Sequence, residues 1–444
     1  MTEGQPRRAV VLVGGPAAPY SRGLRIARSL ASLGYDVEIA AVAADGVPDQ
    51  ETDGEITIRR YRPSGWFAPR ASTGAGKAAP AGTDAAPESG EARPTQRRRR
   101  GPLPRIVDMG TRIAGRLIRW AFWPHTVRGW WATLDRDLAA ADLYHACGSL
   151  TIAPALHAAA RARRQGRAGL VIYDAIDNVF EGNNVLQMPP IVRRVHAARE
   201  RRWARRSGAI ITVNDELSSR LSHRWQVPPI LSVPNYPEPW KPQATGAADR
   251  IRTAAGLSPD TRVVLFQGRL GPNLGLDEAA EAVLQIDGAC LVLLGFGRWF
   301  EQMRRRDQDP RFAGRHVTLP AVHPDELPSW TASADVSLVT LPPVSANQRA
   351  STPNKFWESL LVGTPVVVGP KLDVMAGIVA ELGAGVVAAS MEPAAIAQAI
   401  GTLLAVPAAT AAAERRRVAA EAARRFSWPV AAAGYEALVR SLRV

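Results

Sequence analysis

Cysteine is nearly absent from this chain of 444 residues, which contains only Cys147 and Cys290. The two lie far apart, and no CxxC pair or cluster of cysteine and histidine accompanies them. These absences argue against a disulfide framework and against a structural zinc site. We therefore expect a reducing compartment.

The sequence also lacks an uncharged apolar run of the ~20 residues that a membrane-spanning helix needs. Met1 is followed by Thr2, Glu3 and Gly4 and not by a basic segment with an apolar core, so we expect no secretory leader. Both observations predict a cytoplasmic protein.

Acidic side chains are in the minority, 41 against 55 lysines and arginines, which gives a formal net charge of +14. This charge favours anionic partners, and nucleotide-sugars, anionic lipid headgroups and nucleic acid all meet that description. Because no zinc-finger, RNP or basic-zipper pattern is present, we expect no nucleic-acid partner.

Arginine and tryptophan are interleaved in one stretch, residues 97–131, which opens with four consecutive arginines. On a helical projection of this stretch, one narrow stripe is basic and another face is apolar. The basic stripe consists of Arg105, Arg112, Arg116 and Arg119, and the tryptophans that follow are Trp120, Trp123, Trp130 and Trp131. The pattern predicts peripheral attachment to anionic lipid at the inner face of the cell membrane. The alternative is a helix that packs on its own sheet with its arginines in water.

Strand-like apolar runs alternate with helical stretches along the chain, which predicts an α/β protein with doubly wound parallel sheets. At this length, with 46% apolar residues, two domains of similar size are expected. The first domain is predicted to have strands at residues 8–14, 36–42, 55–61, 142–147, 170–174 and 209–213. The second is predicted to have strands at residues 263–267, 289–294, 316–319, 336–340, 365–368 and 385–388.

A proline-rich segment at residues 234–239, which follows a strand-like run at residues 230–233, predicts the boundary between the two domains. We assign residues 1–236 to an acceptor-side domain, 237–425 to a nucleotide-sugar-binding domain, and 426–444 to a helix that packs back on the first domain. Residues 68–101 have no apolar periodicity and are rich in small residues and proline, which predicts a disordered insert. Two Rossmann-like domains joined in this way face each other across a cleft, where such folds bind ligands.

Four loops of the second half fall at the expected edge of the sheet. The first contains Gly268 and Arg269, where glycine allows close backbone approach and the guanidinium can pair with a diphosphate. The second contains Gly295 and Gly297, which could leave bare backbone for a base or ribose. The third contains Val322 and could border the base; the alternative for the glycine loops is an ordinary tight turn.

The fourth loop, SerThrProAsnLysPheTrpGlu at residues 351–358, is the most specific. Proline suits the first turn of a helix, so Asn354, Lys355 and the helix amino end can face an anion together. Glu358 projects from the same face and can accept hydrogen bonds from ribose hydroxyls. The alternative is a Lys/Glu pair on a solvated helix face.

The chain resembles the retaining family 4 glycosyltransferases, particularly those with "PNK...E" before "aGvPVV". The matching stretches are "DLYHA" at 142–146, "YDAID" at 173–177, "TVNDEL" at 212–217, "VPNYPE" at 233–238, "GRLGPNLGL" at 268–276, "LLGFG" at 293–297, "ADVSLVTL" at 334–341 and "PNKFWE" at 353–358. The resemblance implies the GT-B fold, a nucleoside-diphosphate sugar as donor substrate with no cofactor, no metal, and retention at the anomeric carbon. The acceptor is expected to be a hydroxyl of a glycan, a lipid-linked molecule or another compound, as in polysaccharide biosynthesis.

Residue by residue, the resemblance assigns Gly15 and its loop to the donor phosphate and acceptor side. It assigns Arg269 and Lys355 to the diphosphate, and Glu358 to the ribose. His145 is the remaining catalytic candidate, although a histidine after a strand is as often structural.

The chain departs from the family pattern at three positions. Ala350 stands where many relatives have an acidic residue that holds the sugar, Leu274 where many have lysine, and Cys147 where "HxH" relatives have their second histidine. These departures leave open a GT-B protein with weakened catalysis that serves in binding or assembly. A nicotinamide-dependent oxidoreductase is less well supported, because Gly14-Gly15-Pro16 does not begin a GxGxxG motif.

Overall fold

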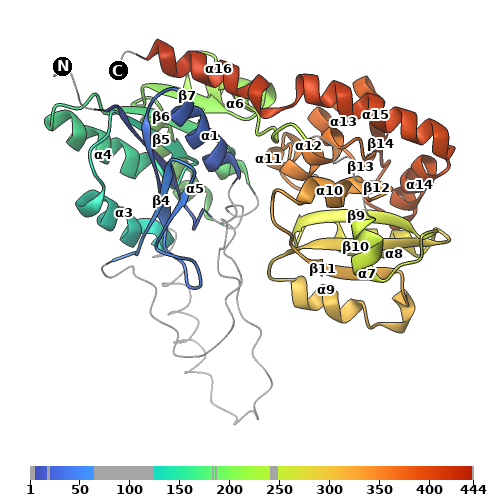
Figure 1. Ribbon diagram of the computed structural model, residues 1–444. Coiled ribbons are helices and arrows are strands. Elements are labelled where there is room, and N and C mark those ends of the chain that lie inside the picture. The colour runs from blue at the N-terminus through green and yellow to red at the C-terminus, as the bar shows by residue number, and fades with distance from the viewer. Residues whose placement is uncertain are drawn as a thin grey trace, which may run out of the picture. The chain divides into compact units, whose positions relative to one another are not determined.

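The computed structural model describes residues 6–17, 21–64, 125–182, 185, 188–240 and 249–442 (Figure 1). Contacts divide the chain into a first unit that ends at Ile210 and a second unit, Ile211–Arg443. The division falls inside strand β7, which ends two residues later at Thr212. The boundaries predicted at residues 236 and 425, and the docking of the last helix, stay predictions.

The first sheet has eight strands in the order β3-β4-β2-β1-β5-β6-β7-β8. Strand β1 pairs in parallel with β2 and β5, β2 with β4, and β5 with β6, whereas β3 and β4 are antiparallel. The strands are β1 (Arg8–Val13), β2 (Asp36–Val42), β3 (Gln50–Asp53), β4 (Ile56–Tyr61), β5 (Leu143–Cys147), β6 (Leu170–Ala175), β7 (Ala209–Thr212) and β8 (Leu231–Ser232). The helices around them are α1 (Ser21–Ser32), α3 (His125–Asp137), α4 (Ile152–Arg164), α5 (Pro190–Ala204) and α6 (Asp215–Trp225).

The second sheet has six strands in the order β11-β10-β9-β12-β13-β14, and all its neighbours are parallel. Its strands are β9 (Arg262–Arg269), β10 (Ala289–Phe296), β11 (His316–Pro320), β12 (Val336–Val339), β13 (Val366–Val368) and β14 (Gly385–Val387). The helices are α7 (Arg250–Ala255), α8 (Leu276–Val283), α9 (Phe300–Arg306), α10 (Leu327–Ala332), α11 (Ala346–Arg349), α12 (Asn354–Leu361), α13 (Asp373–Leu382), α14 (Pro393–Leu404), α15 (Ala408–Arg425) and α16 (Trp428–Ser441).

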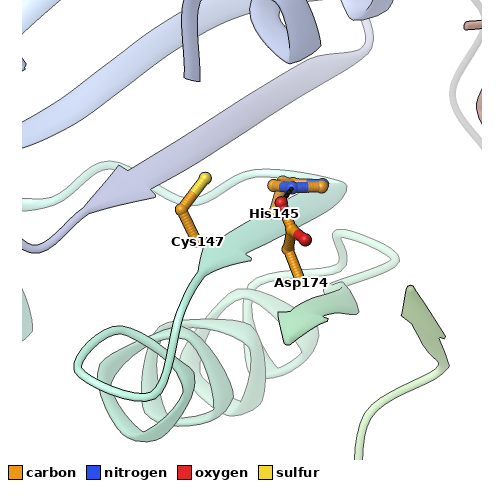
Figure 2. Close-up of side chains that lie close together, drawn as sticks. All are labelled: His145, Cys147 and Asp174. Carbon is orange, nitrogen blue, oxygen red and sulfur yellow. Dashed lines mark hydrogen bonds and ion pairs between the residues drawn. The ribbon is translucent and has the colours of Figure 1, made fainter. Parts of the chain in front are cut away.

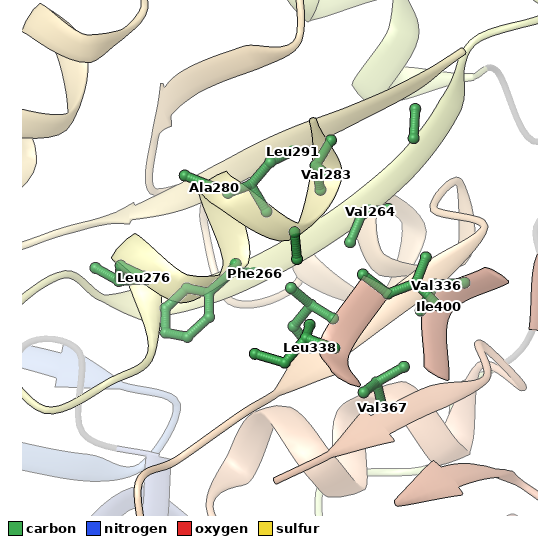
Figure 3. Close-up of a cluster of buried hydrophobic side chains, with 14 of the residues drawn as sticks. Val264, Phe266, Leu276, Ala280, Val283, Leu291, Val336, Leu338, Val367 and Ile400 are labelled. Atoms are coloured by element: carbon green, nitrogen blue, oxygen red, sulfur yellow. The ribbon is translucent and has the colours of Figure 1, made fainter. Parts of the chain in front are cut away.

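The core of the second unit lies where helices α8 and α14 cover the central strands (Figure 3). Phe266 of β9, Leu291 of β10, Leu338 of β12 and Ile400 of α14 are all completely buried there. Strands that are covered on both faces must be apolar along their whole length, which is why these runs are visible in the sequence.

The position of the strand order reversal decides where a ligand can bind. Strand β9 pairs with β10 on one side and with β12 on the other, so the chain winds outward from β9 in both directions. In sheets of this kind, ligands bind outside the carboxyl ends of the strands at that point. The carboxyl end of β9 is therefore the place to look.

All thirteen predicted strands have a counterpart within a few residues, counting the one proposed before the proline-rich segment, which is now β8 (Leu231–Ser232). The prediction missed β3, because Gln50–Asp53 is polar and lies at an exposed sheet edge. The expected insert at 68–101 and the amphipathic stretch before residue 125 lie outside the described residues.

Two tryptophans of the expected membrane-binding stretch can be placed. Trp130 is completely buried and its indole N–H donates to the Ala41 carbonyl at 2.9 Å. The indole N–H of Trp131 donates to the carbonyl of Leu150, also at 2.9 Å. Including Trp130 in a membrane-facing surface is therefore wrong, since α3 buries this side chain in its own unit.

Among the described residues, no single helix has both the length and the apolar character of a membrane span. Only α14 taken together with the α15–α16 stretch meets that test, and these two parts are bent by 97° at their junction.

Candidate functional site

Three of the predicted site residues meet at the carboxyl end of β9. Arg269 is the last residue of this strand and is exposed. Lys355 and Glu358 come from the first turns of α12, which begins at Asn354. Both charges act on the Lys355 ammonium, so the three side chains form one electrostatic group.

The Lys355 side chain lies on the core and not in solvent. Its Nζ is 3.2 Å from the centroid of the Phe266 ring, a cation–π contact, and the residue as a whole is half-buried. Burial lowers the pKa of Lys355 to about 7, with Glu358 raising it and Arg269 lowering it. An anionic ligand beside this ammonium would stabilise its charged form.

The Glu358 carboxylate is held by a separate set of hydrogen bonds. The side-chain amide of Gln267 donates to Glu358 Oε2 at 2.7 Å, and the Thr331 hydroxyl donates to Gln267 Oε1 at 2.7 Å. Gln267 and Thr331 are both buried, so this chain of hydrogen bonds sets the orientation of the carboxylate. Lys355 and Glu358 are therefore only partly exposed, and each has a contact in the second unit.

The sequence did not reveal these supporting residues as part of the site. Phe266, Gln267 and Thr331 come from a strand and a helix distant in sequence from α12, and nothing in their local pattern marks them. Gln267 offers a weak signal, because a polar side chain in an otherwise apolar strand needs a buried partner.

Asn354, the first residue of α12, accepts a hydrogen bond from the Asn235 side-chain amide at 2.6 Å. Asn235 belongs to the proline-rich segment, so this segment holds the amino end of the helix. The next residue, Tyr236, packs edge-on against Trp357 with ring centroids 4.7 Å apart.

The glycines of the first and second loops are needed for different physical reasons. A Cβ on Gly295 would lie 1.9 Å from the carbonyl oxygen of Gly268, and one on Gly297, which has φ of +125°, would lie 2.5 Å from that of Leu270. These two glycines are required because the ends of β9 and β10 pack backbone against backbone. A Cβ on Gly268 or Gly271 would meet no atom within 4 Å, so open space for a ligand lies along this loop.

The loop after β11 offers weaker support for a ligand site. Val322 is half-buried against the apolar cluster that includes Ile251 and Val292. His323 is 70% exposed and lies 3.5 Å from an oxygen of Asp325, as expected of a surface residue at a helix entry.

In the first unit, the loop that contains Gly15 is held in place by backbone and side-chain contacts. The Gly15 carbonyl accepts from the amide of Val42 at 2.9 Å. The buried guanidinium of Arg60 donates through Nε to the carbonyl of Pro16 at 2.7 Å. The loop thus has a defined shape at the carboxyl end of β1.

His145 lies at the centre of a buried ionic network in the same unit. Its Nε2 is 3.3 Å from Asp174 Oδ2, and Arg22 donates to both oxygens of that carboxylate, at 2.6 and 2.8 Å. All three side chains are at most 2% exposed. Burial raises the pKa of Asp174, but Arg22 and His145 outweigh it and hold that pKa below its usual value. Burial lowers the pKa of His145, so its imidazole is neutral near pH 7.

Cys147 completes a group that resembles a metal site in composition. Ligand atoms of His145, Cys147 and Asp174 lie within 4.8 Å of one another, and Figure 2 shows the three side chains at the ends of β5 and β6. Both oxygens of Asp174 are already engaged by the Arg22 guanidinium, whose positive charge opposes a second cation. The group therefore does not fit a metal ion.

Comparison with known proteins bears on this geometry. Residues 261–406 match the family model described as glycosyl transferases group 1. This match lies within the second unit. The matched range contains Arg269, Lys355 and Glu358. Comparison with curated proteins gives no match.

Solved structures share the fold over nearly the whole chain. Sucrose-phosphate synthase from Thermosynechococcus elongatus has a TM-score of 0.65 at 16% identity, covering 98% of this chain and 99% of that chain. HepE from Anabaena in complex with UDP-glucose has a TM-score of 0.61 at 14% identity, covering 98% and 100%. The α,α-trehalose-phosphate synthase (UDP-forming) from Burkholderia vietnamiensis has a TM-score of 0.58 at 15% identity, covering 98% and 100%.

These likenesses, with the two largely parallel sheets, confirm the predicted α/β class and the GT-B fold. At such low identity they show the fold alone. Membership of family 4, retention, the absence of a metal requirement and the role of each site residue remain predictions.

Proposed function

We propose that this protein is a retaining glycosyltransferase that takes its sugar from a nucleoside-diphosphate sugar bound by the second unit. The observation that carries the proposal is the group formed by Arg269, Lys355 and Glu358 at the carboxyl end of β9. Two cationic groups beside one oriented carboxylate match a ligand that has a diphosphate next to a ribose. HepE, which shares the fold, was solved in complex with UDP-glucose, and the trehalose-phosphate synthase of the same fold is UDP-forming.

The proposed reaction breaks the bond between the anomeric carbon and the diphosphate oxygen and forms a bond from that carbon to an acceptor hydroxyl oxygen. The acceptor attacks from the face that the leaving group departs from, and its proton passes to a phosphate oxygen. Negative charge grows on the leaving diphosphate, where Arg269 and Lys355 stabilise it together with the amino end of α12. No protein nucleophile is needed in this scheme.

Glu358 has the other task of recognising the ribose. Its Oε2 accepts from Gln267, which orients the carboxylate, and a carboxylate has acceptor positions for more than one hydrogen bond. A charge-assisted hydrogen bond of this kind contributes about 1.5 to 3 kcal/mol. This carboxylate therefore favours ribonucleotides over 2'-deoxyribonucleotides.

Substitutions at the two α12 positions test the proposal. Lys355→Ala should weaken binding of nucleoside diphosphate about tenfold or more and slow sugar transfer further, because charge grows in the transition state. Glu358→Gln should mainly reduce discrimination between UDP or GDP and their 2'-deoxy forms. Arg311→Ala and Glu392→Gln serve as controls, since both are exposed charges on other elements.

Calorimetry with each nucleoside diphosphate gives the affinities, and a thermal-shift screen across nucleotide-sugars and NAD first identifies the ligand. If both variants stay folded and keep wild-type affinity for every nucleotide tested, the donor site lies elsewhere. Binding of NAD without binding of any nucleotide-sugar would instead support an oxidoreductase.

Two of the residues that depart from the family pattern make contacts within the fold. Leu274 packs against two of the core clusters of the second unit, and the carbonyl of the buried Ala350 accepts from the Asn214 side-chain amide at 2.8 Å. A protein that has lost transfer but kept binding would retain nucleotide affinity and show no transfer or donor hydrolysis. Measuring donor hydrolysis therefore separates the enzyme from a binding or assembly protein.

A further inference from the structure

Helix α5 has one face that nothing in the described residues covers. Its inner side carries His196, Glu200 and Ala204, which are buried. On the opposite side, Ile191 is 72% exposed and Val195 is 60% exposed, the two highest values among the large hydrophobic residues that the structure describes. Because they are four positions apart, the two side chains lie next to each other on the helix.

The same face is strongly basic. Arg194 and Arg202 of the helix, and Arg205 and Arg206 just after its end, are all exposed, and within the described part of the chain no ion pair involves any of them. The one acidic residue of the helix, Glu200, is buried and accepts from the Tyr173 hydroxyl at 2.7 Å. The face therefore combines positive charge with aliphatic surface and has no acidic side chain.

Several exposed arginines on other helices have an acidic partner. In α6, Arg220 pairs with Glu216, and in α16, Arg440 pairs with Glu436. In α15, Arg417 and Arg424 pair with Glu414 and Glu421. Each of these arginines has an acidic partner within one turn of its own helix, which is usual for a face that only meets water.

We propose that this exposed surface, formed by Ile191, Arg194, Val195 and Arg202 of α5 and by Arg205 and Arg206 just after the helix, docks the protein on an anionic phospholipid surface. Phosphate headgroups satisfy the four guanidinium groups, and the two aliphatic side chains enter the boundary between headgroups and acyl chains. The helix has 15 residues and so lies along the surface for about 22 Å. This inference concerns location and does not depend on the donor site proposed above.

Charge and chemistry separate this occupant from others. The stretch of this chain at residues 97–124 carries eight arginines and one acidic residue, so its charge has the same sign as that of the face. Nucleic acid gains little from exposed isoleucine and valine, and the face offers no aromatic side chain on which a base could stack.

Flotation of the full-length protein with vesicles tests the proposal. The vesicles are phosphatidylcholine alone or an equal mixture with phosphatidylglycerol, at low and at high salt. Arg202→Gln combined with Arg205→Gln should lower the partition coefficient on anionic vesicles about 25-fold, since each basic residue near such a surface contributes about fivefold. The matched control, Arg417→Gln with Arg424→Gln, removes the same charge from α15 and should change it less than about threefold.

A second variant examines the aliphatic part of the surface. Ile191→Ser combined with Val195→Ser should lower binding about tenfold, and this difference should persist at high salt, where charge attraction is screened. All these positions are exposed, so an unchanged thermal unfolding midpoint confirms that the variants are folded.

Three outcomes would overturn the proposal. The first is the absence of wild-type binding to anionic vesicles at low salt, which would leave an acidic protein as the partner of this face. The second is binding to phosphatidylcholine alone with equal strength. The third is wild-type binding by both α5 variants, which would place the lipid contact elsewhere in the chain, such as the 97–124 stretch.

Discussion

Lys355 combines a positive charge with an apolar support, and this combination makes nucleotide binding depend on pH. Burial lowers the pKa of its ammonium to about 7 in the free protein, so at pH 8 most molecules have a neutral amine. A bound diphosphate favours the charged form and raises that pKa. Binding at pH 8 must therefore take up a proton, and affinity must fall as pH rises above 7, by up to tenfold per unit.

Calorimetry with a nucleotide-sugar measures this uptake directly. The donor's own diphosphate is a diester and does not titrate near neutral pH, so a proton taken up belongs to the protein. Titrations at pH 8 in two buffers of different ionisation enthalpy should give different observed heats, whereas titrations at pH 6 should agree. Lys355→Met should abolish the difference; uptake that survives in this variant would contradict the assignment.

Asp174 illustrates a residue whose charge stabilises the fold and not the ligand. It neutralises the Arg22 guanidinium inside the first unit, where both side chains are at most 2% exposed. Asp174→Asn leaves that guanidinium buried without its counterion and should lower the free energy of unfolding by about 3 to 5 kcal/mol. Urea unfolding measures the loss.

The exposed pair of Arg28 and Asp53 provides the control, because its Arg Nη2 donates to the carboxylate at 2.7 Å in a solvated setting. Asp53→Asn should cost less than about 1 kcal/mol. The pH dependence follows from the lowered pKa of Asp174. Its contribution is present above the unfolded-state pKa of about 3.9 and is lost as pH falls through the lower, folded-state pKa. Equal losses for the two variants would contradict the buried-pair argument.

At the scale of elements, helix α12 depends on the proline-rich segment for its position. Tyr236 contacts Trp357 of this helix, and also Phe426 with ring centroids 5.5 Å apart. Burial raises the pKa of the Tyr236 hydroxyl to about 12, which indicates apolar surroundings. The ring, and not the hydroxyl, therefore makes the contacts that hold the helix. Tyr236→Ala should therefore weaken nucleotide binding although this residue touches none of the three charged groups.

The expected loss is about threefold to tenfold in affinity, the effect of losing aromatic contacts of about 0.5 to 1.5 kcal/mol that hold the helix in place. Tyr236→Phe should restore wild-type affinity. Binding is measured at a temperature well below the unfolding midpoint, where all of the variant is folded. A weaker affinity under this condition cannot come from a general loss of stability. If the alanine variant binds as the wild type does, α12 is positioned without the segment.

The elements differ in how far the sequence predicts them. Strands β9 and β10 were predicted because parallel strands buried on both faces must be continuous apolar runs. Strand β3 was not, since a polar edge strand is stabilised by its partner and not by its own composition. The motif on α12 predicted Lys355 and Glu358, but Phe266 and Gln267 enter the site only through the packing of β9 against that helix.

At the scale of the whole molecule, the sequence predicted two α/β domains and the GT-B fold from the order of its motifs. It could not predict that the first unit has a buried ion pair at Asp174, because Arg22 and Asp174 are 152 positions apart in the chain. Long-range pairing of this kind depends on the finished sheet. The alternation of strands and helices, by contrast, is local and is visible in any short window.

The stretch between the first unit's β4 and α3 gives the last prediction. Its low apolar content predicts that it adds nothing to a core, so removal of residues 72–95 should leave fold and nucleotide affinity unchanged. The described residues on either side are already joined: the Ser64 amide donates to the Gly129 carbonyl at 3.0 Å, and the Thr133 hydroxyl donates to the Arg62 carbonyl at 2.8 Å. A shorter connection therefore has only a short distance to span.

The thermal unfolding midpoint should change by less than about 2 °C, which corresponds to about 0.5 kcal/mol or less for a domain of this size. A drop of several degrees would show that these residues pack against the first unit after all.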